Sequence, residues 1–190
     1  MPPPMDKQPI KEQHFTYDDY YSWDDGKRWE LIYGQAYLME PGPTGVHQGV
    51  SGNLHRQLAN FLYRKPGKVY AAPYDVRLFD DTVNDTVVQP DLVVICDQSK
   101  LDERGCKGAP DMVVEILSPS TAGRDRVKKL NLYQKAGVRE YWIVDPDSKS
   151  VSVHTMKNGE YIATAYGSED TAPVHVLEGC AIILADVFAL

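Results

Sequence analysis

Two uninterrupted apolar runs, residues 92–95 and 112–114, restrict the fold more than any other feature of this chain. A strand with one face in water alternates polar and apolar residues, whereas a run that is apolar at every position fits a strand covered on both faces. Apolar residues recur at helical spacing over residues 44–63 and 124–136, so two helices are available as covers. We therefore predict an α/β (α+β) fold in which helices flank a mixed sheet.

Local signals place the other elements. Thr16 can cap a short helix with two aspartates in its first turn, and Gly137 stands where a helix end favours glycine. The pair Asn158-Gly159 is a strong hairpin signal. The expected elements are helices over residues 17–22, 44–63 and 124–136, a strand-like stretch over 29–39 with a turn at Gly34, strands over 69–79, 87–96, 112–117 and 140–144, and a hairpin of 151–156 with 161–166.

The length of 190 residues fits one domain, which we place at residues 15–190. Residues 1–14, which begin Pro-rich and polar, are expected to form a flexible N-terminal tail. The three cysteines, Cys96, Cys106 and Cys180, form no CxxC pair and are expected to be reduced thiols. The sequence shows no signal-peptide pattern and no apolar stretch long enough to span a bilayer. We expect a cytoplasmic protein without a membrane partner.

The charge balance bears on the class of partner. The chain has 20 Lys and Arg against 27 Asp and Glu, a net charge of -7. Non-specific nucleic-acid coat proteins take their affinity from basic residues on phosphates, so this balance argues against that class. It leaves room for a local basic patch beside a cleft, because net charge does not describe the distribution of charge.

Glu115 is a carboxylate inside an apolar strand, residues 112–117. An ionised carboxylate buried there without a partner would cost several kcal/mol or would have a raised pKa. Asp91 opens the apolar run 92–95 and poses the same problem. If the two strands are neighbours, one Mg²⁺ or Mn²⁺ ion could be held by both carboxylates, since these ions prefer oxygen ligands. The alternative is that Asp91 caps a strand and Glu115 pairs with a core lysine.

Lys129 lies on the apolar arc of the helix predicted after Glu115, at about 100° per residue. A lysine on a buried helix face needs an acidic partner, and this face should lie against the strand that carries Glu115. An ammonium group there could orient a water nucleophile and stabilise charge on phosphoryl oxygens. The alternative is a structural ion pair, for which Asp125 stands one turn earlier.

Several motifs occur in order over roughly residues 15 to 166. They are Trp29-Glu30-Leu31-Ile32-Tyr33-Gly34, the Pro-rich turn before His47, Gln89-Pro90-Asp91-Leu92, Pro110-Asp111-Met112-Val113-Val114-Glu115-Ile116-Leu117-Ser118-Pro119-Ser120, Asp125-Arg126-Val127-Lys128-Lys129-Leu130 with Tyr133, and Gly137-Val138-Arg139-Glu140-Tyr141-Trp142-Ile143-Val144-Asp145-Pro146. Together these motifs resemble the Uma-two family of restriction-endonuclease-like proteins in the PD-(D/E)xK nuclease superfamily.

The resemblance implies a strongly curved mixed sheet flanked by helices, with Asp91 and Glu115 at the two acidic positions of the superfamily motif. The superfamily lysine should stand two residues after Glu115, where this chain has Leu117. In the Uma-two pattern a lysine on the following helix takes that place, and here it is Lys129. Glu30 resembles an acidic residue that some of these nucleases use as an extra metal contact, and its alternative is an ordinary edge-strand carboxylate.

His47 begins the apolar face of its helix, so it can point into the cleft, and its alternative is a hydrogen-bonded core histidine. We predict a Mg²⁺-dependent or Mn²⁺-dependent endonuclease with Asp91, Glu115 and Lys129 as catalytic residues and nucleic acid, DNA in particular, as substrate. A related hydrolase acting on RNA or a small phosphodiester would use the same residues. A homodimer is expected, because nucleases that cut both strands often pair two subunits. The rival is a catalytically silent nuclease-fold protein that acts as a binding or scaffold module.

Overall fold

The computed structural model describes residues 13–39, 42–80, 82–118 and 124–190. The helices are α1 (Tyr17–Tyr21), α2 (Gly45–Leu62), α3 (Arg124–Ala136) and α4 (Leu184–Val187), with a 3-10 turn at Gln98–Lys100. The strands are β1 (Trp29–Ile32), β2 (Gln35–Leu38), β3 (Lys68–Ala71), β4 (Val76–Arg77), β5 (Val87–Val88), β6 (Leu92–Ile95), β7 (Leu101–Asp102), β8 (Gly105–Lys107), β9 (Met112–Ile116), β10 (Glu140–Asp145), β11 (Ser150–Lys157), β12 (Glu160–Gly167), β13 (Thr171–Pro173) and β14 (Ala181–Ile183).

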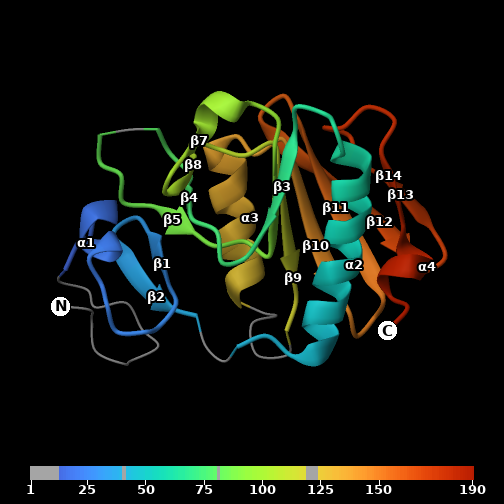
Figure 1. Cartoon of the computed structure of the whole chain (residues 1–190), viewed down its shortest axis with the longest axis horizontal. Coiled ribbons are helices and arrows are strands. Elements are labelled where there is room, and N and C mark those ends of the chain that lie inside the picture. Colours follow the sequence, from blue (N-terminus) through green and yellow to red (C-terminus); the bar gives the residue numbers. More distant parts are fainter. Residues whose placement is uncertain (1–12, 40–41, 81, 119–123) are drawn as a thin grey trace.

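The strands form two six-stranded sheets and a separate pair (Figure 1). The first sheet has the order β2-β1-β5-β4-β8-β7 and lies at the end of the molecule that carries α1. The second has the order β12-β11-β10-β9-β6-β3, in which β9 and β10 run parallel and the other neighbours antiparallel. This mixed α+β architecture confirms the predicted fold class.

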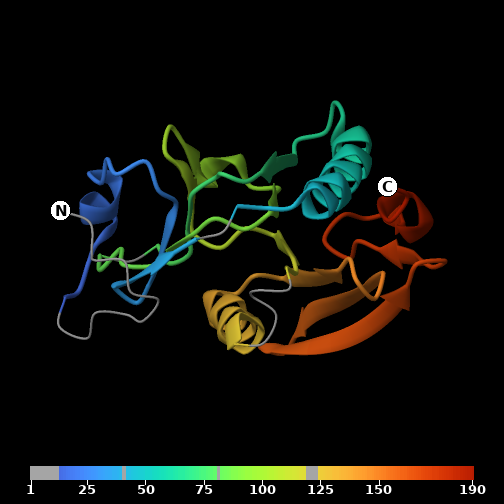
Figure 2. The same cartoon turned by 90° about the horizontal axis from the view of Figure 1, so that it is seen from below.

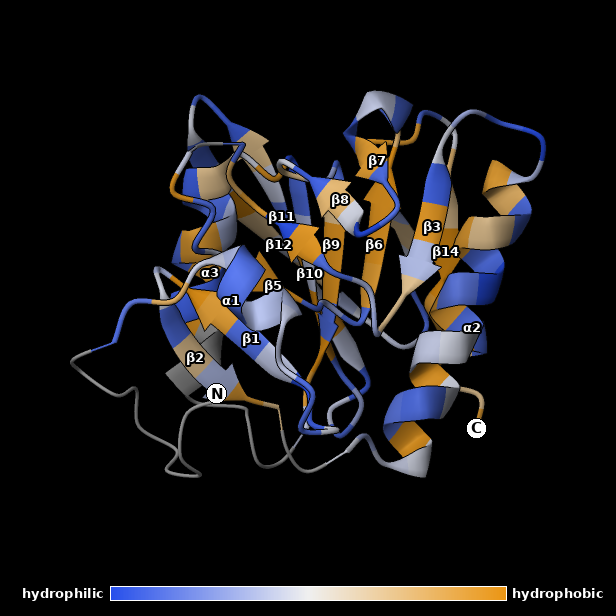
Figure 3. Ribbon diagram, turned by 60° about the vertical axis from the view of Figure 1, so that its left-hand side comes forward, coloured by the Kyte–Doolittle hydropathy of each residue, from blue (hydrophilic) through white to orange (hydrophobic). Residues whose placement is uncertain are grey.

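The second sheet is covered on both faces, as its apolar strands predicted. Alternate residues of one strand point to opposite faces, and Leu92 and Val94 pack with α2 while Val93 and Ile95 pack with α3 and part of the first sheet. Figure 3 shows β6 as apolar along its length, and β9 is apolar except at Glu115. α2 turns one apolar stripe to the sheet, and each such buried side chain contributes about 1.5–3 kcal/mol. The stripe consists of Val50, Leu54, Leu58 and Leu62.

The predicted helices lie where the sequence placed them, within one or two residues at their ends. Thr16 caps α1 through a reciprocal capping box with Asp19. The stretch 29–39 is the hairpin of β1 and β2, with the turn at Tyr33 and Gly34, both of which have positive φ. The last hairpin, β11 with β12, turns at Asn158-Gly159, where both residues have positive φ, as the Asn-Gly signal predicted.

Two predictions of continuous strands are wrong. The stretch 69–79 contains β3, in the second sheet, and β4, in the first, and the stretch 87–96 is divided in the same way between β5 and β6. Pro73 and Pro90 lie at the two breaks, and a proline has no N–H to donate to a strand ladder. Apolar content marks a residue as buried, but it does not show in which sheet the residue pairs.

Residues 1–12 of the predicted tail lie outside the described residues, and the tail boundary stays a prediction. His14 is described, and its Nε2 atom lies 3.2 Å from the Oδ2 atom of Asp85. The three cysteines are free thiols. No helix within the described ranges is long and apolar enough to cross a membrane.

Candidate functional site

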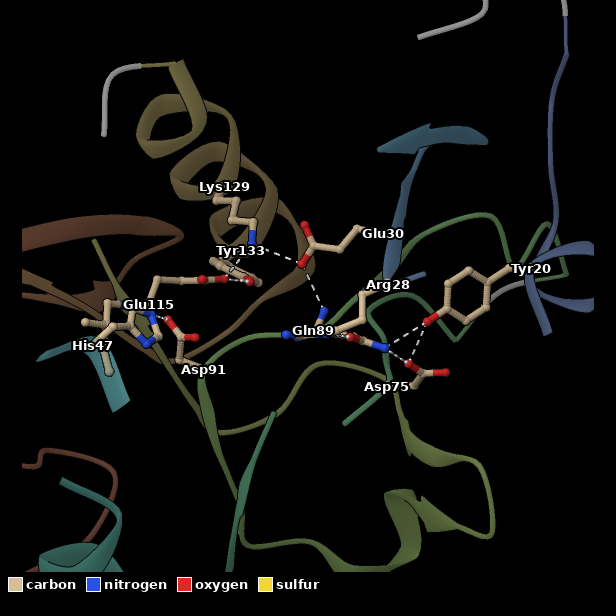
Figure 4. A network of polar contacts seen from close by, with 11 residues as sticks. Tyr20, Arg28, Glu30, His47, Asp75, Gln89, Asp91, Glu115, Lys129 and Tyr133 are labelled. Carbon is tan, nitrogen blue, oxygen red and sulfur yellow. Dashed lines mark hydrogen bonds and ion pairs between the residues drawn. The ribbon is translucent and has the colours of Figure 1, made fainter. Parts of the chain in front are cut away.

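The ladder between β6 and β9 brings the two predicted carboxylates together. Leu92 pairs with Val114 in this antiparallel ladder, so the next position along it sets Asp91 opposite Glu115. Residues opposite each other in such a ladder point to the same face of the sheet, with Cβ atoms about 4.5–5.5 Å apart. Figure 4 shows Glu115 directed at Lys129 and Tyr133 of α3, with Asp91 beside it and against His47. Pro90 ends the first-sheet pairing of this segment, and Asp91 therefore stands at the junction between the sheets.

Lys129 reaches Glu115, one member of this pair, from α3. Its Nζ atom lies 2.9 Å from Oε1 of Glu115 and 3.0 Å from Oε1 of Glu30, so one ammonium links α3, β9 and β1. The side chains of Lys129 and Glu115 are 14% and 15% exposed, which leaves the site open to solvent from one side. The predicted placement of Lys129 against Glu115 is what the structure shows. The side chain of Asp125 lies outside the part that the structure describes.

Tyr133 and Gln89 complete the centre, and the sequence did not single out either as a site residue. The Tyr133 hydroxyl donates to Oε1 of Glu115 at 2.6 Å, although the ring is fully buried in the core. The Gln89 backbone N–H donates to Oε1 of Glu30 at 2.9 Å. A signal for Tyr133 exists in the sequence, because it lies four residues after Lys129 and therefore on the same helix face. No signal of that kind exists for Gln89, since its role depends on a contact with β1.

Burial and charge set the protonation of the centre. Burial raises the pKa of Glu115 to about 7, against the Lys129 ammonium, which lowers it, and with Asp91 and Glu30, which raise it further. Burial would lower the pKa of Lys129, but the attraction of Glu115 and Glu30 outweighs it and the pKa is raised. Lys129 is therefore a cation. Glu115 and Glu30 share this ammonium, and Asp91 lies beside them with His47 as its own partner. When all three carboxylates are ionised, they and Lys129 carry a net charge of minus two, which favours a bound cation.

His47 lies in the first turn of α2 and meets Asp91, as its inward orientation predicted. Its Nε2 atom lies 3.2 Å from Oδ2 of Asp91, and the same oxygen accepts the Ile116 backbone N–H at 2.7 Å. The hydrogen bond to Asp91 raises the pKa of His47 against its burial. Among the described residues, its Nδ1 atom is buried without a hydrogen-bond partner. Asp91 is thus held on one oxygen by a strand amide and an imidazole.

The carboxylates of Asp91 and Glu115 fit a Mg²⁺ or Mn²⁺ ion that takes its other ligands from water and substrate. Within the described ranges, no group of three or more His, Cys, Asp or Glu side chains is arranged to hold a metal ion. Mg²⁺ usually keeps several waters and is bound through one or two carboxylates together with substrate phosphates, rather than in a closed protein cage. Asp91 and Glu115 match that pattern. Glu30 is 5% exposed and occupied by the Lys129 ammonium and the Gln89 amide, which favours a role in holding Lys129 over metal contact.

A second hydrogen-bond network anchors the strand that carries Glu30. The Gln89 side chain accepts from Nε of Arg28 at 3.0 Å and donates to Asp75 at 2.9 Å. It also donates to the Tyr20 hydroxyl, which in turn donates to Asp75 at 2.8 Å. Figure 4 shows this chain of contacts running from the Glu30 carboxylate toward α1. Both the Oε1 and the Nε2 atom of Gln89 are thereby hydrogen-bonded, and its backbone amide is held against Glu30.

A basic and aromatic surface lies beside the centre. Lys128 and Lys135 are exposed on α3, seven residues apart and hence on one helix face. Their Nζ atoms lie 5.2 Å and 4.8 Å from the ring centroids of Tyr37 and Tyr33, which belong to the β1–β2 hairpin. This Lys–Tyr surface flanks the helix position from which Lys129 turns inward. It supplies local positive charge on a chain whose net charge is -7.

Comparison with known proteins places the chain in a family. The sequence model of Uma2, described as "Putative restriction endonuclease", matches residues 17–185. The chain belongs to the Uma2 family. A curated relative, "Uncharacterized protein slr1290" of Synechocystis, is 27% identical over 157 residues, which cover 80% of each chain. The family assignment confirms the resemblance to Uma-two proteins.

The fold of the Uma2 chain also matches a solved structure. That structure is a protein of Anabaena variabilis described as "a putative nuclease belonging to DUF820". The TM-score is 0.74 at 19% sequence identity, with 92% of this chain and 98% of the other covered. At that identity the likeness shows the shared fold.

Proposed function

We propose that this Uma2 chain is a metal-dependent nuclease that hydrolyses phosphodiester bonds, with DNA as its substrate and the cytoplasm as its location. The observation that carries the proposal is the position of the Lys129 ammonium. It lies within hydrogen-bond distance of Glu115, opposite Asp91, although the position two residues after Glu115 is Leu117. A lysine brought in from α3 thus contacts Glu115, one member of the acidic pair of the superfamily motif.

The contacts of each residue in the centre indicate its role. Asp91 and Glu115 would hold the cation, and His47 and the Ile116 amide fix the orientation of Asp91. Lys129 spends two of its three N–H donors on Glu115 and Glu30 and can direct the third at a water or a phosphoryl oxygen. When bound there, Mg²⁺ or Mn²⁺ supplies Lewis-acid chemistry that polarises the phosphoryl group and favours ionisation of water.

The substrate class follows from the surface beside the centre. Lysine side chains attract a phosphate backbone, and aromatic faces accept stacked bases. The Lys–Tyr surface offers both within one or two helical turns of Lys129. The family description and the described neighbour in Anabaena variabilis favour a nuclease by analogy.

A second candidate is a catalytically silent binding module. Lys129 already forms ion pairs with Glu115 and Glu30, and such a closed network stabilises a fold whether or not it performs chemistry. In that case the Lys–Tyr surface would still bind nucleic acid, while the acidic pair would have lost its cation.

Two measurements on the full chain separate these functions. The first is a Mn²⁺ titration by calorimetry on the wild type, Asp91→Asn and Glu115→Gln, with Asp147→Asn as the control because Asp147 is an exposed turn residue. We expect one site in the wild type and the control, and a loss of affinity of at least tenfold in the two site variants. Absence of binding in the wild type, or equal binding in all four proteins, would contradict the metal site.

The second measurement is cleavage of plasmid DNA, single-stranded DNA and RNA with Mg²⁺ or Mn²⁺, in the wild type and Lys129→Gln. We expect the variant to lose at least a hundredfold in rate, since it lacks the charge that stabilises the reacting phosphate. Metal binding without cleavage of any of the three substrates would favour the silent binding module.

A further inference from the structure

The strand β12 forms an open edge of the second sheet. Within the described ranges it is hydrogen-bonded on one side only, to β11, and Figure 2 shows it along the outer border of the molecule. It has eight residues, whereas the other edge strands of the two six-stranded sheets, β2, β3 and β7, have four, four and two. Its central residues, 162–165, are all exposed, and Ile162 is 50% exposed.

Hydrogen bonds from backbone N–H groups at both ends of β12 show which residues direct their backbone away from β11. The Tyr161 N–H donates to the Gln134 side chain, and the Gly167 N–H donates to the Asp170 carboxylate, both away from β11. In an antiparallel ladder the N–H and C=O groups of alternate residues point to the same side. Ala163 and Ala165 therefore direct their N–H and C=O groups at solvent in the middle of the strand.

The strand lacks the devices that usually protect an edge. Natural edge strands carry lysine, proline or a bulge, or are short or covered, because an exposed row of N–H and C=O groups pairs with other strands. No charged residue and no proline occurs between Glu160 and Glu169. β3, at the opposite edge of the same sheet, is short, starts with Lys68 and packs against α2.

We propose that β12 is the interface of a homodimer, in which the strand pairs antiparallel with β12 of a second copy to give a continuous twelve-stranded sheet. An antiparallel pair of identical strands has two-fold symmetry, which is the arrangement that most homodimers adopt. The outward groups fix the register. Ala163 pairs with Ala165 of the second copy, which makes four N–H···O bonds across a two-fold axis at Thr164.

This register is self-complementary in its side chains as well. Thr164 meets its own copy and Ile162 meets Tyr166, and both threonine pairs and aromatic to β-branched pairs are favourable across strands. The partner is a second copy rather than an unrelated strand for two reasons. The central segment contains no charge that would repel the same segment of another copy, and in the antiparallel arrangement the outward N–H and C=O groups of Ala163 and Ala165 pair with those of the second copy.

The dimer also bears on the proposed function. When two sheets pair edge to edge about this two-fold axis, the faces covered by α3 lie on the same side of the joined sheet. The two α3 helices and the two Lys129 centres would therefore face one side of the dimer. A dimer of this geometry presents two sites to one double-stranded substrate. This consequence rests on the proposed nuclease function, whereas the interface itself does not.

The first test is the molar mass of the full chain by light scattering after size exclusion. We expect a dimer in the wild type and a monomer in Thr164→Lys, because two lysines would lie directly opposite each other at the two-fold axis. Thr171→Lys is the matched control, since Thr171 is also exposed and on a strand, and it should remain dimeric. A monomeric wild type, or a dimer that persists in Thr164→Lys, would overturn the proposal.

A covalent test fixes the register. Thr164 would form a non-hydrogen-bonded pair with its copy, with Cα atoms about 4.5 Å apart, which a disulfide can span. In a background with Cys96→Ser, oxidised Thr164→Cys should give a two-chain band on non-reducing gels, and Thr171→Cys should not. Failure of the cross-link in a dimeric protein would place the interface elsewhere. Both Thr164 variants should bind Mn²⁺ as the wild type does. Retained binding would show that the variants fold and that a lost dimer is not a lost metal site.

Discussion

Replacing Lys129 by methionine tests the electrostatic logic of the centre. The substitution keeps most of the side-chain volume and removes the ammonium that contacts Glu115 at 2.9 Å and Glu30 at 3.0 Å. Both carboxylates then lack their counter-ion in a site where each side chain is less than one-fifth exposed. Removing one partner of a buried ion pair costs about 3–5 kcal/mol, because the remaining charge is left without compensation.

The assay is urea unfolding in the presence of EDTA, followed by tryptophan fluorescence. With a urea m-value of about 2–3 kcal/mol/M, a loss of about 3–5 kcal/mol moves the midpoint down by about 1–2.5 M. The double variant Lys129→Met/Glu115→Gln should recover part of that loss, since it removes one of the two unpaired charges. A single variant within 0.5 M of the wild type, or a double variant less stable than the single one, would refute the reasoning.

Three further outcomes follow from other contacts. Tyr133→Phe should lower the free energy of unfolding by about 1.5–3 kcal/mol, because it removes a hydroxyl bonded to a carboxylate, and thermal unfolding in EDTA measures this. Burial would raise the pKa of Asp111, but the Cys96 N–H and the Arg139 guanidinium outweigh it and hold the pKa below its usual range. Asp111→Asn should therefore be less stable than the wild type at pH 7, by about 1–2 kcal/mol, and the gap should close as the pH falls below about 4; a gap independent of pH would contradict this. Lys128→Gln/Lys135→Gln should weaken binding of single-stranded DNA and make its salt dependence shallower by about one to two units of slope, with Lys149→Gln unchanged, as fluorescence anisotropy in EDTA can show.

The sequence by itself determined the parts of the protein that depend on neighbours along the chain. Helical period located α2 and α3, the Asn158-Gly159 pair located the last hairpin, and continuous apolar runs marked β6 and β9 as covered on both faces. The same reasoning picked out Asp91, Glu115 and Lys129, because a charged residue at a buried position needs a partner. Each of these conclusions uses a period or a local preference, which a single sequence contains.

Only the tertiary structure decided the contacts between segments distant in the chain. Glu30 and Lys129 are 99 residues apart and meet because the fold sets β1 beside α3. The spacing of Tyr133 from Lys129 gives the helix face of Tyr133 but not its hydrogen bond to Glu115, and no pattern indicates the contact of the Gln89 amide with Glu30. A pattern shows which face of an element is buried but not which element it meets. For the same reason the sequence indicated that the buried carboxylates need partners, whereas only the tertiary structure showed which residues these partners are.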